Sequence, residues 1–206
     1  MGHEQKEPLD AERLVFFSDA VVAIAITLLA LDLRLEHAHD PITFGDIGGM
    51  WRKWAAFILS FVLIGTFWKV HHQFFRHIRH TDGMLMNHNL LWLLFIVTLP
   101  FSTTLVSDGF DQQVPMFVYS MNTFLLTTFQ NNIWDHACVR PHLMHQGVSA
   151  ELVREYRIAC NVAVVNSVLA VALSMFLPLV AFLVLFTRPL MIAAATRYYL
   201  RRGARK

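Results

Sequence analysis

The chain of 206 residues is 55% hydrophobic and 16% charged, with a mean hydropathy of +0.45 and a formal net charge of +2. One soluble core of this length does not bury so much apolar surface, so the composition predicts an integral membrane protein. The basic residues lie beside apolar segments rather than in one patch, which argues against a nucleic-acid partner. No polar stretch is long enough to fold separately, so residues 1–206 are expected to form one domain.

Six apolar segments predict an all-α, polytopic membrane fold with six transmembrane helices. Each segment is close to the roughly 20 residues that cross a bilayer. The expected spans, in chain order, are Leu14–Leu33, Trp51–Val70, Leu85–Val106, Val114–Trp134, Ile158–Phe176 and Pro178–Tyr199. The last two form one apolar run, which we divide at Leu177-Pro178 because proline disfavours a helical residue before it and favours a helix start. The longer polar links are expected over residues 36–49, 71–82 and 135–156.

The distribution of Lys and Arg predicts the orientation. Most of the 17 basic residues fall at the two ends of the chain and in the links after the second and fourth spans. The positive-inside rule therefore places both termini in the cytoplasm, in a multi-pass protein of the cell membrane. The polar N-terminus shows no cleavable signal peptide. A C-terminal basic cluster is expected to attract anionic lipid; it comprises Arg197, Arg201, Arg202, Arg205 and Lys206.

The first apolar segment has two distinct faces. At about 100° per residue, one narrow stripe lies within about 60° of Ile24. It contains Arg13, Phe17, Ala20, Thr27, Leu28 and Leu31. The stripe is compatible with ordinary lipid-facing or packing residues as well as with a functional lining. Ser18 and Asp19 point about 120° and 140° away from Ile24, toward the rest of the bundle.

Asp19 requires a partner, because a carboxylate in hydrocarbon is costly unless it is paired. It is either a buried hydrogen-bond anchor or a proton or ion site, and its position off the stripe favours the anchor. The candidate partners are Trp68, His71 or His72, and Asn89. Arg13 either joins the same network or stands at the cytoplasmic mouth.

The pattern Arg13-x-x-x-Phe17-Ser18-Asp19, followed by Thr27 and Leu28-Leu29, resembles the signature of the transmembrane protein 175 family of potassium channels in its short prokaryotic form. Supporting matches are Phe67-Trp68 with His71 and His72, Asn89-Leu90, and Pro100-Phe101. The resemblance implies a homotetramer with a central pore lined by the first helix. It also implies that Ile24 forms the narrowest constriction, with Leu28 and Leu31 as further rings, and that a structural or gating network contains Arg13, Phe17, Ser18, Asp19, Trp68, His71, His72 and Asn89.

The function implied is conduction of potassium with modest selectivity over sodium. Aliphatic rings do not replace the hydration shell of an ion, so such a pore gates by dewetting. The Thr27 hydroxyl is expected to offer a partial substitute, whereas Ala23 stands where longer family members have a serine. The alternative is a secondary transporter, proton-coupled or proton-conducting, that uses Asp19 and the histidines. No inverted repeat supports that alternative.

Other site chemistry is weakly indicated. Glycine-rich phosphate loops, nucleophile elbows and paired carboxylates are absent, so the sequence does not predict an enzyme. The histidines at 71, 72, 77, 80 and 88 suggest a metal site, a solvated link or an acid sensor. Neighbouring Arg76 and Arg79 would repel a cation, so we expect no metal and no cofactor beside the permeant potassium. Asp135 and His136 are expected either to cap the fourth helix or to touch the link after the second.

Overall fold

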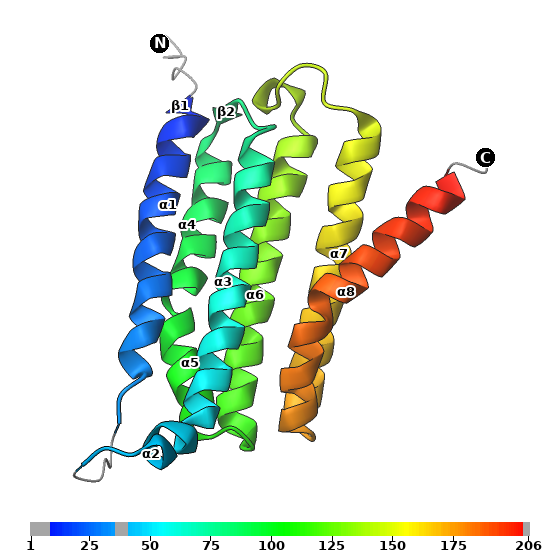
Figure 1. Ribbon diagram of the computed structural model, residues 1–206. Coiled ribbons are helices and arrows are strands. Elements are labelled where there is room, and N and C mark those ends of the chain that lie inside the picture. The colour runs from blue at the N-terminus through cyan, green and yellow to red at the C-terminus, as the bar shows by residue number, and fades with distance from the viewer. Residues whose placement is uncertain (1–8, 36–40, 204–206) are drawn as a thin grey trace.

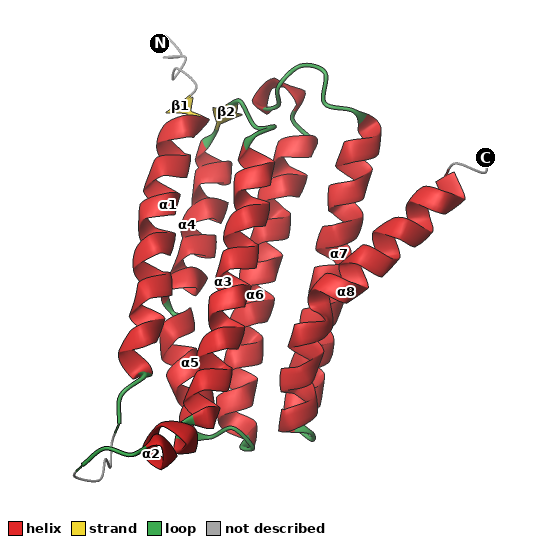
Figure 2. Ribbon diagram, in the orientation of Figure 1, coloured by secondary structure: helices red, strands yellow, loops and turns green. Residues whose placement is uncertain are grey.

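Helices make up nearly all of the computed structural model, which describes residues 9–35 and 41–203 (Figures 1 and 2). The elements are β1 (Leu9–Asp10), α1 (Ala11–Leu28), η1 (Leu29–Asp32), α2 (Phe44–Gly49), α3 (Trp51–Phe75), β2 (His80–Thr81), α4 (Gly83–Val97), α5 (Leu99–Asp108), α6 (Gln113–Cys138), η2 (Pro141–Leu143), α7 (Ala150–Ser174) and α8 (Pro178–Gly203). Four of the six predicted spans fall on one long helix each, whereas the first falls on α1 and η1 and the third on α4 and α5. The all-α class is therefore confirmed.

Several helices extend beyond the predicted spans. His71 and His72 lie inside α3 and not in the link that follows it, and α6 continues through His136 to Cys138. The start of α7 was expected at Ile158, but α7 begins at Ala150, where the Ser149 side chain accepts a hydrogen bond from the Leu152 N–H. These corrections share one cause: a helix continues through polar residues as long as its backbone bonds and caps are satisfied.

The third predicted span is broken into two helices. Residues 85–106 were expected to form one helix, but α4 ends at Val97 and α5 begins at Leu99. Pro100 explains the break, because it lacks an N–H and clashes with the preceding turn. Asn122 of α6 contacts this point by donating to the Phe95 carbonyl and to Ser102, at 3.3 Å each. The Thr98 hydroxyl donates to Asn122 Oδ1 at 3.1 Å.

Five helical segments in the described residues are long and apolar enough to cross a membrane: 11–32, 51–75, 83–108, 150–174 and 178–199. Helix α6 is as long as these but does not belong to the set, because polar side chains recur along it. Two of them lie in the interior of the bundle: Asn122 and Gln130 are buried, and Gln130 Nε2 donates to the Phe67 carbonyl at 2.8 Å. The α6 side chains thus replace water for groups inside the bundle.

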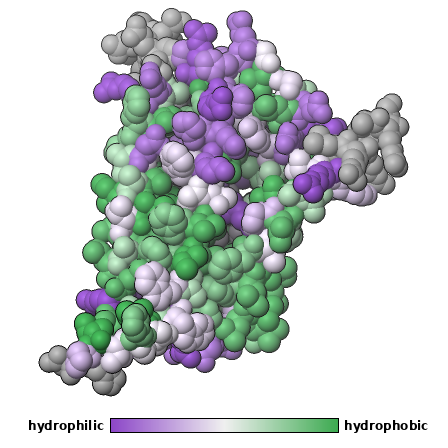
Figure 3. All heavy atoms as spheres, in the orientation of Figure 1, coloured by the Kyte–Doolittle hydropathy of each residue, from purple (hydrophilic) through white to green (hydrophobic). Residues whose placement is uncertain are grey.

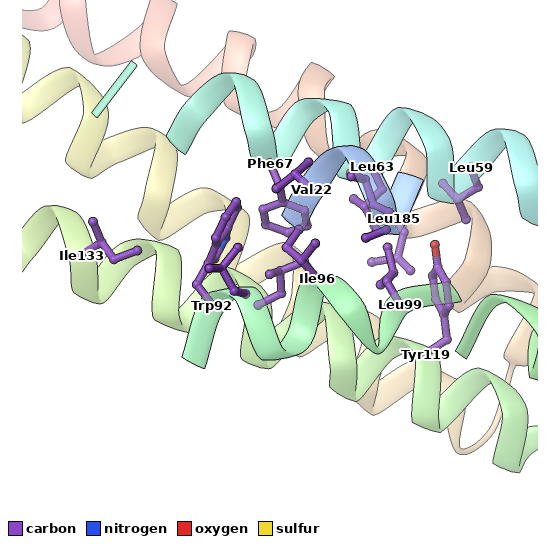
Figure 4. Packing of buried hydrophobic residues seen from close by; sticks show 14 of the residues in the cluster. Val22, Leu59, Leu63, Phe67, Trp92, Ile96, Leu99, Tyr119, Ile133 and Leu185 are labelled. Carbon is purple, nitrogen blue, oxygen red and sulfur yellow. The ribbon is translucent and has the colours of Figure 1, made fainter. Parts of the chain in front are cut away.

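The core lies between α1, α3, α4, α5, α6, α7 and α8, and Figure 4 shows the packing of part of it. Large side chains of different helices meet there, including Phe67, Trp92 and Tyr119. Figure 3 shows hydrophilic residues gathered at the end of the bundle where α1 begins, above a largely hydrophobic body. Backbone pairing ties that end together, since β1 pairs with β2 and Ile78 bridges Met144.

The outermost helix, α8, is bent. Pro189 lies inside it, and Figure 1 shows its second half leaning away from the bundle. The expected turn between the last two spans is present, with α7 ending at Ser174 and α8 beginning at Pro178. Of the predicted basic cluster, Arg205 and Lys206 lie outside the described residues.

Candidate functional site

One face of α1 is left uncovered by the rest of the subunit. Ile24, Leu28 and Leu31 are 61%, 42% and 71% exposed, and we call these three residues the aliphatic edge. The remaining stripe residues, Arg13, Phe17, Ala20 and Thr27, are exposed as well. The periodicity therefore identified the outward face correctly.

Thr27 is the polar residue beside the aliphatic edge. Its hydroxyl donates to the Ile24 carbonyl at 2.7 Å. The proton is used within the helix, so the hydroxyl oxygen keeps both lone pairs as acceptors and no free proton. An oxygen in this state can accept a hydrogen bond or contact a cation, but it does not donate to an anion.

The opposite face of α1 is built from small residues. Ala11, Ser18, Val22 and Ala25 are buried there, and α1 packs against α3 and α4. Small side chains allow helices to approach closely, which is how membrane helices associate without a hydrophobic driving force between them. The two faces of α1 therefore carry side chains of different size: small ones toward the bundle and bulky aliphatic ones on the exposed side.

A buried hydrogen-bond chain connects this face to α3 and α4. His71 Nε2 lies 2.7 Å from Asn89 Oδ1, Asn89 Nδ2 donates to Ser18 Oγ at 2.9 Å, and Ser18 Oγ donates to the Leu14 carbonyl at 2.8 Å. Because Ser18 uses its proton on Leu14, it must accept from the Asn89 amide. The amide oxygen then faces His71, so His71 carries its proton on Nε2. The direction of the hydrogen bonds along this chain therefore assigns the Nε2–H tautomer to His71.

The imidazole of His71 is also held by rings. It stacks on Trp92 with ring centroids 4.3 Å apart, and the centroid of the Phe75 ring lies 4.5 Å from that of His71. His71 Nδ1 has no hydrogen-bond partner among the described residues. The ring is therefore positioned by stacking and by a single hydrogen bond.

Asp19 contacts Trp68 at the edge of this region. Trp68 Nε1 donates to Asp19 Oδ1 at 2.8 Å, and the His72 ring lies 5.8 Å from the Trp68 ring. The expected contact between Asp19 and Trp68 is thus present. Of the residues grouped by the resemblance, the structure brings together Ser18, Asp19, Trp68, His71, His72 and Asn89. Arg13 and Phe17 lie apart on the exposed face, and within the described residues Arg13 makes no hydrogen bond or ion pair.

The sequence did not single out a second polar cluster, formed by Asp82, His136 and Arg140. His136 Nε2 lies 2.9 Å from both Asp82 oxygens, and Arg140 Nε lies 3.8 Å from Oδ2. Partial burial opposes ionisation of Asp82, but hydrogen bonds from the Leu85 N–H and His136 outweigh it and hold the pKa of Asp82 below its ordinary value. His136 thus touches the link after the second span, one of the two arrangements considered for it. The sequence feature that could have pointed to this cluster is Asp82 itself, which stands at the N-cap of α4.

The histidines that suggested a metal site are dispersed. His71 belongs to the buried chain, His88 lies beside His136, and His77 packs near Trp134 and Tyr156. Burial, together with the charges of Arg76 and His145, lowers the pKa of His77. Among the described residues, no group of three or more His, Cys, Asp or Glu is placed to hold a metal ion.

Comparisons with known proteins point to one family. Residues 13–100 match the family model described as endosomal/lysosomal potassium channel TMEM175. A Streptomyces collinus protein named a potassium channel is 33% identical over 154 residues, which cover 72% of this chain and 75% of that protein. The chicken protein named endosomal/lysosomal proton channel TMEM175 is 33% identical over 64% of this chain and 29% of its own length.

A solved structure agrees with these sequence matches. The crystal structure of a lysosomal potassium-selective channel TMEM175 homolog from Chamaesiphon minutus superposes with a TM-score of 0.72 at 26% identity. The match covers 90% of this chain and 97% of that one. It includes the outer helices, for which the sequence signature offered no support.

Proposed function

The chain belongs to the transmembrane protein 175 family of ion channels, and from that premise we propose that it forms a homotetrameric potassium channel of the cell membrane with modest selectivity over sodium. It is a membrane cation channel and not an enzyme. In the proposed assembly both termini are cytoplasmic, α6 is a sixth crossing, and α1 lines a central pore that is narrowest at Ile24.

The exposed aliphatic edge is the observation that carries this proposal. Ile24, Leu28 and Leu31 are not used to stabilise their own subunit, since each is exposed in it. Around a symmetry axis they would form stacked apolar rings, and such rings close a pore by excluding water. A polar network on the opposite face of α1 holds the rotation of the helix that presents them.

Selectivity in this proposal is modest because the lining offers few oxygens. Thr27 supplies one outward hydroxyl oxygen per subunit, and Ala23 supplies none. Potassium sheds water more readily than sodium, so a lining that barely compensates dehydration favours potassium to a limited degree. Reversal potentials under potassium and sodium gradients measure this preference.

The direct test is Ile24→Asn in protein reconstituted into planar bilayers. Asparagine keeps the constriction wet, so single-channel potassium conductance should rise several-fold. Leu183→Asn is the matched control, because Leu183 is 62% exposed but lies on α8, away from α1 (Figure 1). Equal currents in Ile24→Asn and wild type would show that Ile24 does not line the pore. A change of conductance in Leu183→Asn alone would show that the pore is not lined by α1.

Proton conduction is the second candidate, because the chicken relative is named a proton channel. The same bilayers test it with a pH gradient at symmetrical potassium. A reversal potential that follows the proton gradient supports this candidate, and one that stays near zero contradicts it.

A further inference from the structure

Helix α8 contains a buried arginine with unsatisfied hydrogen-bond donors among the described residues. Arg188 is 4% exposed, and neither its Nε nor its Nη1 has a partner among the described residues. The guanidinium lies over the Phe67 ring, 4.1 Å from the centroid. This contact covers one face of the planar group, but the N–H donors point in the plane and are not satisfied by it.

Arg188 lines a cavity of about 340 Å³ between α3, α6, α7 and α8. Figure 3 shows a hollow on this side of the molecule, between α3 and α8, with hydrophilic residues inside it. Pro189 follows Arg188 directly within the bent helix α8, and α7 contributes small residues such as Ala159 and Ala163 to the wall of the cavity. Its size lies within the range of small-ligand pockets.

No carboxylate of the described residues is in direct contact with the Arg188 guanidinium. Glu155 also lines the cavity, but within the described residues no ion pair joins Arg188 to any carboxylate. A guanidinium keeps its proton at neutral pH, so the charge cannot be relieved by deprotonation. Buried arginines in membrane segments are normally paired or mark a binding site. A bound anion would pair with the guanidinium and accept hydrogen bonds from its unsatisfied donors.

The chemistry of the cavity narrows the choice of anion. A guanidinium binds phosphate oxygens in a two-pronged geometry, which suits it to phosphate groups. Besides Arg188, the side-chain amide of Gln73 lines the cavity as a polar donor, whereas Val70, Leu152 and Ile192 provide apolar walls. A guanidinium and an amide donor beside apolar walls match the junction between a phospholipid head group and its chains.

We propose that the Arg188 cavity binds a phosphate-bearing anion, with an anionic phospholipid as the source that its apolar walls favour. This site is distinct from the basic C-terminal cluster and does not depend on where the pore lies. If the lipid test contradicts this site, the proposed pore along α1 still stands, and if the conductance test contradicts the pore, the proposed site still stands.

The test measures thermal stability of the purified full-length protein in detergent. Phosphatidylglycerol, phosphatidylcholine and inorganic phosphate are titrated into wild type, Arg188→Gln and the control Arg154→Gln, which changes an exposed arginine of α7. Phosphatidylglycerol should raise the melting temperature of wild type and Arg154→Gln by several degrees, saturably, and that of Arg188→Gln by much less. Without lipid, Arg188→Gln should be at least as stable as wild type, because it removes an uncompensated charge.

The outcomes separate the sources and the alternatives. A shift with phosphatidylglycerol that needs Arg188 supports a lipid, and an equal Arg188-dependent shift with inorganic phosphate supports a free anion. Equal responses of wild type and Arg188→Gln, or equal responses to phosphatidylglycerol and phosphatidylcholine, overturn the proposal. If Arg188→Gln does not fold, Ala159→Phe replaces it: this variant fills the cavity but keeps the charge, and it should also lose the shift.

Discussion

The two faces of α1 are suited to different surroundings. The inner face consists of small residues and hydrogen-bonded polar groups such as Ser18, which is completely buried. The outer face presents bulky aliphatic side chains, and Leu31 is 71% exposed. Helix α1 therefore packs against its own subunit mainly through the inner face. The outer face is available for contact beyond the subunit, which is what a pore lining requires.

We expect substitutions on the two faces of α1 to have opposite effects on stability and on conduction. Substitutions on the inner face should change the free energy of unfolding and leave the ion preference unchanged. Substitutions on the outer face should change conduction and leave the free energy of unfolding within about 0.5 kcal/mol, as is usual for exposed positions.

The largest effect is expected for Asn89→Leu on the inner side. The change removes the acceptor for His71 Nε2–H and the donor to Ser18, leaving buried polar groups unsatisfied. The free energy of unfolding should fall by roughly 2–3 kcal/mol. Denaturation of the purified protein in detergent measures it. The neighbouring Leu90→Ala is the control, because Leu90 is 47% exposed. An Asn89→Leu protein as stable as wild type would contradict the importance of this chain.

A slightly smaller effect is expected from overpacking at Ala25. This residue is 0% exposed, so Ala25→Leu must push α1 away from its neighbours and should lower the free energy of unfolding by about 1–3 kcal/mol. Ile24→Leu, one residue along on the other face, should leave it nearly unchanged. Similar losses of stability for both variants would mean that the two faces do not differ in the way described.

The smallest effect concerns the contact between Trp68 and Asp19. Trp68→Phe removes the indole donor and should lower the free energy of unfolding by about 1 kcal/mol. Trp54→Phe is the control, since Trp54 is 40% exposed and its indole N–H makes no hydrogen bond among the described residues. The potassium-to-sodium ratio should be the same in both variants. A clear change of that ratio in Trp68→Phe would instead assign Asp19 to the ion path.

Local patterns predicted several features of α1 correctly. Helical periodicity separated the aliphatic edge from Ser18 and Asp19 because the rotation per residue is set by backbone geometry alone. The need of a carboxylate for a partner pointed to Trp68, which donates to Asp19. Sequence reasoning did not find the Asp82–His136 pair or the break at Thr98, since each depends on which side chain of another helix lies nearby.

The sequence by itself determined the helical class and the position of the long helices, because apolar length and backbone hydrogen bonding leave a membrane segment few alternatives. Its signature on α1 also identified the family. Only the tertiary structure decided how polar residues of α6 are accommodated, how Asn89 orders the proton on His71, and that Arg188 lies over Phe67 beside a cavity. These features depend on distances between residues far apart in the chain, and such distances exist only once the helices have packed.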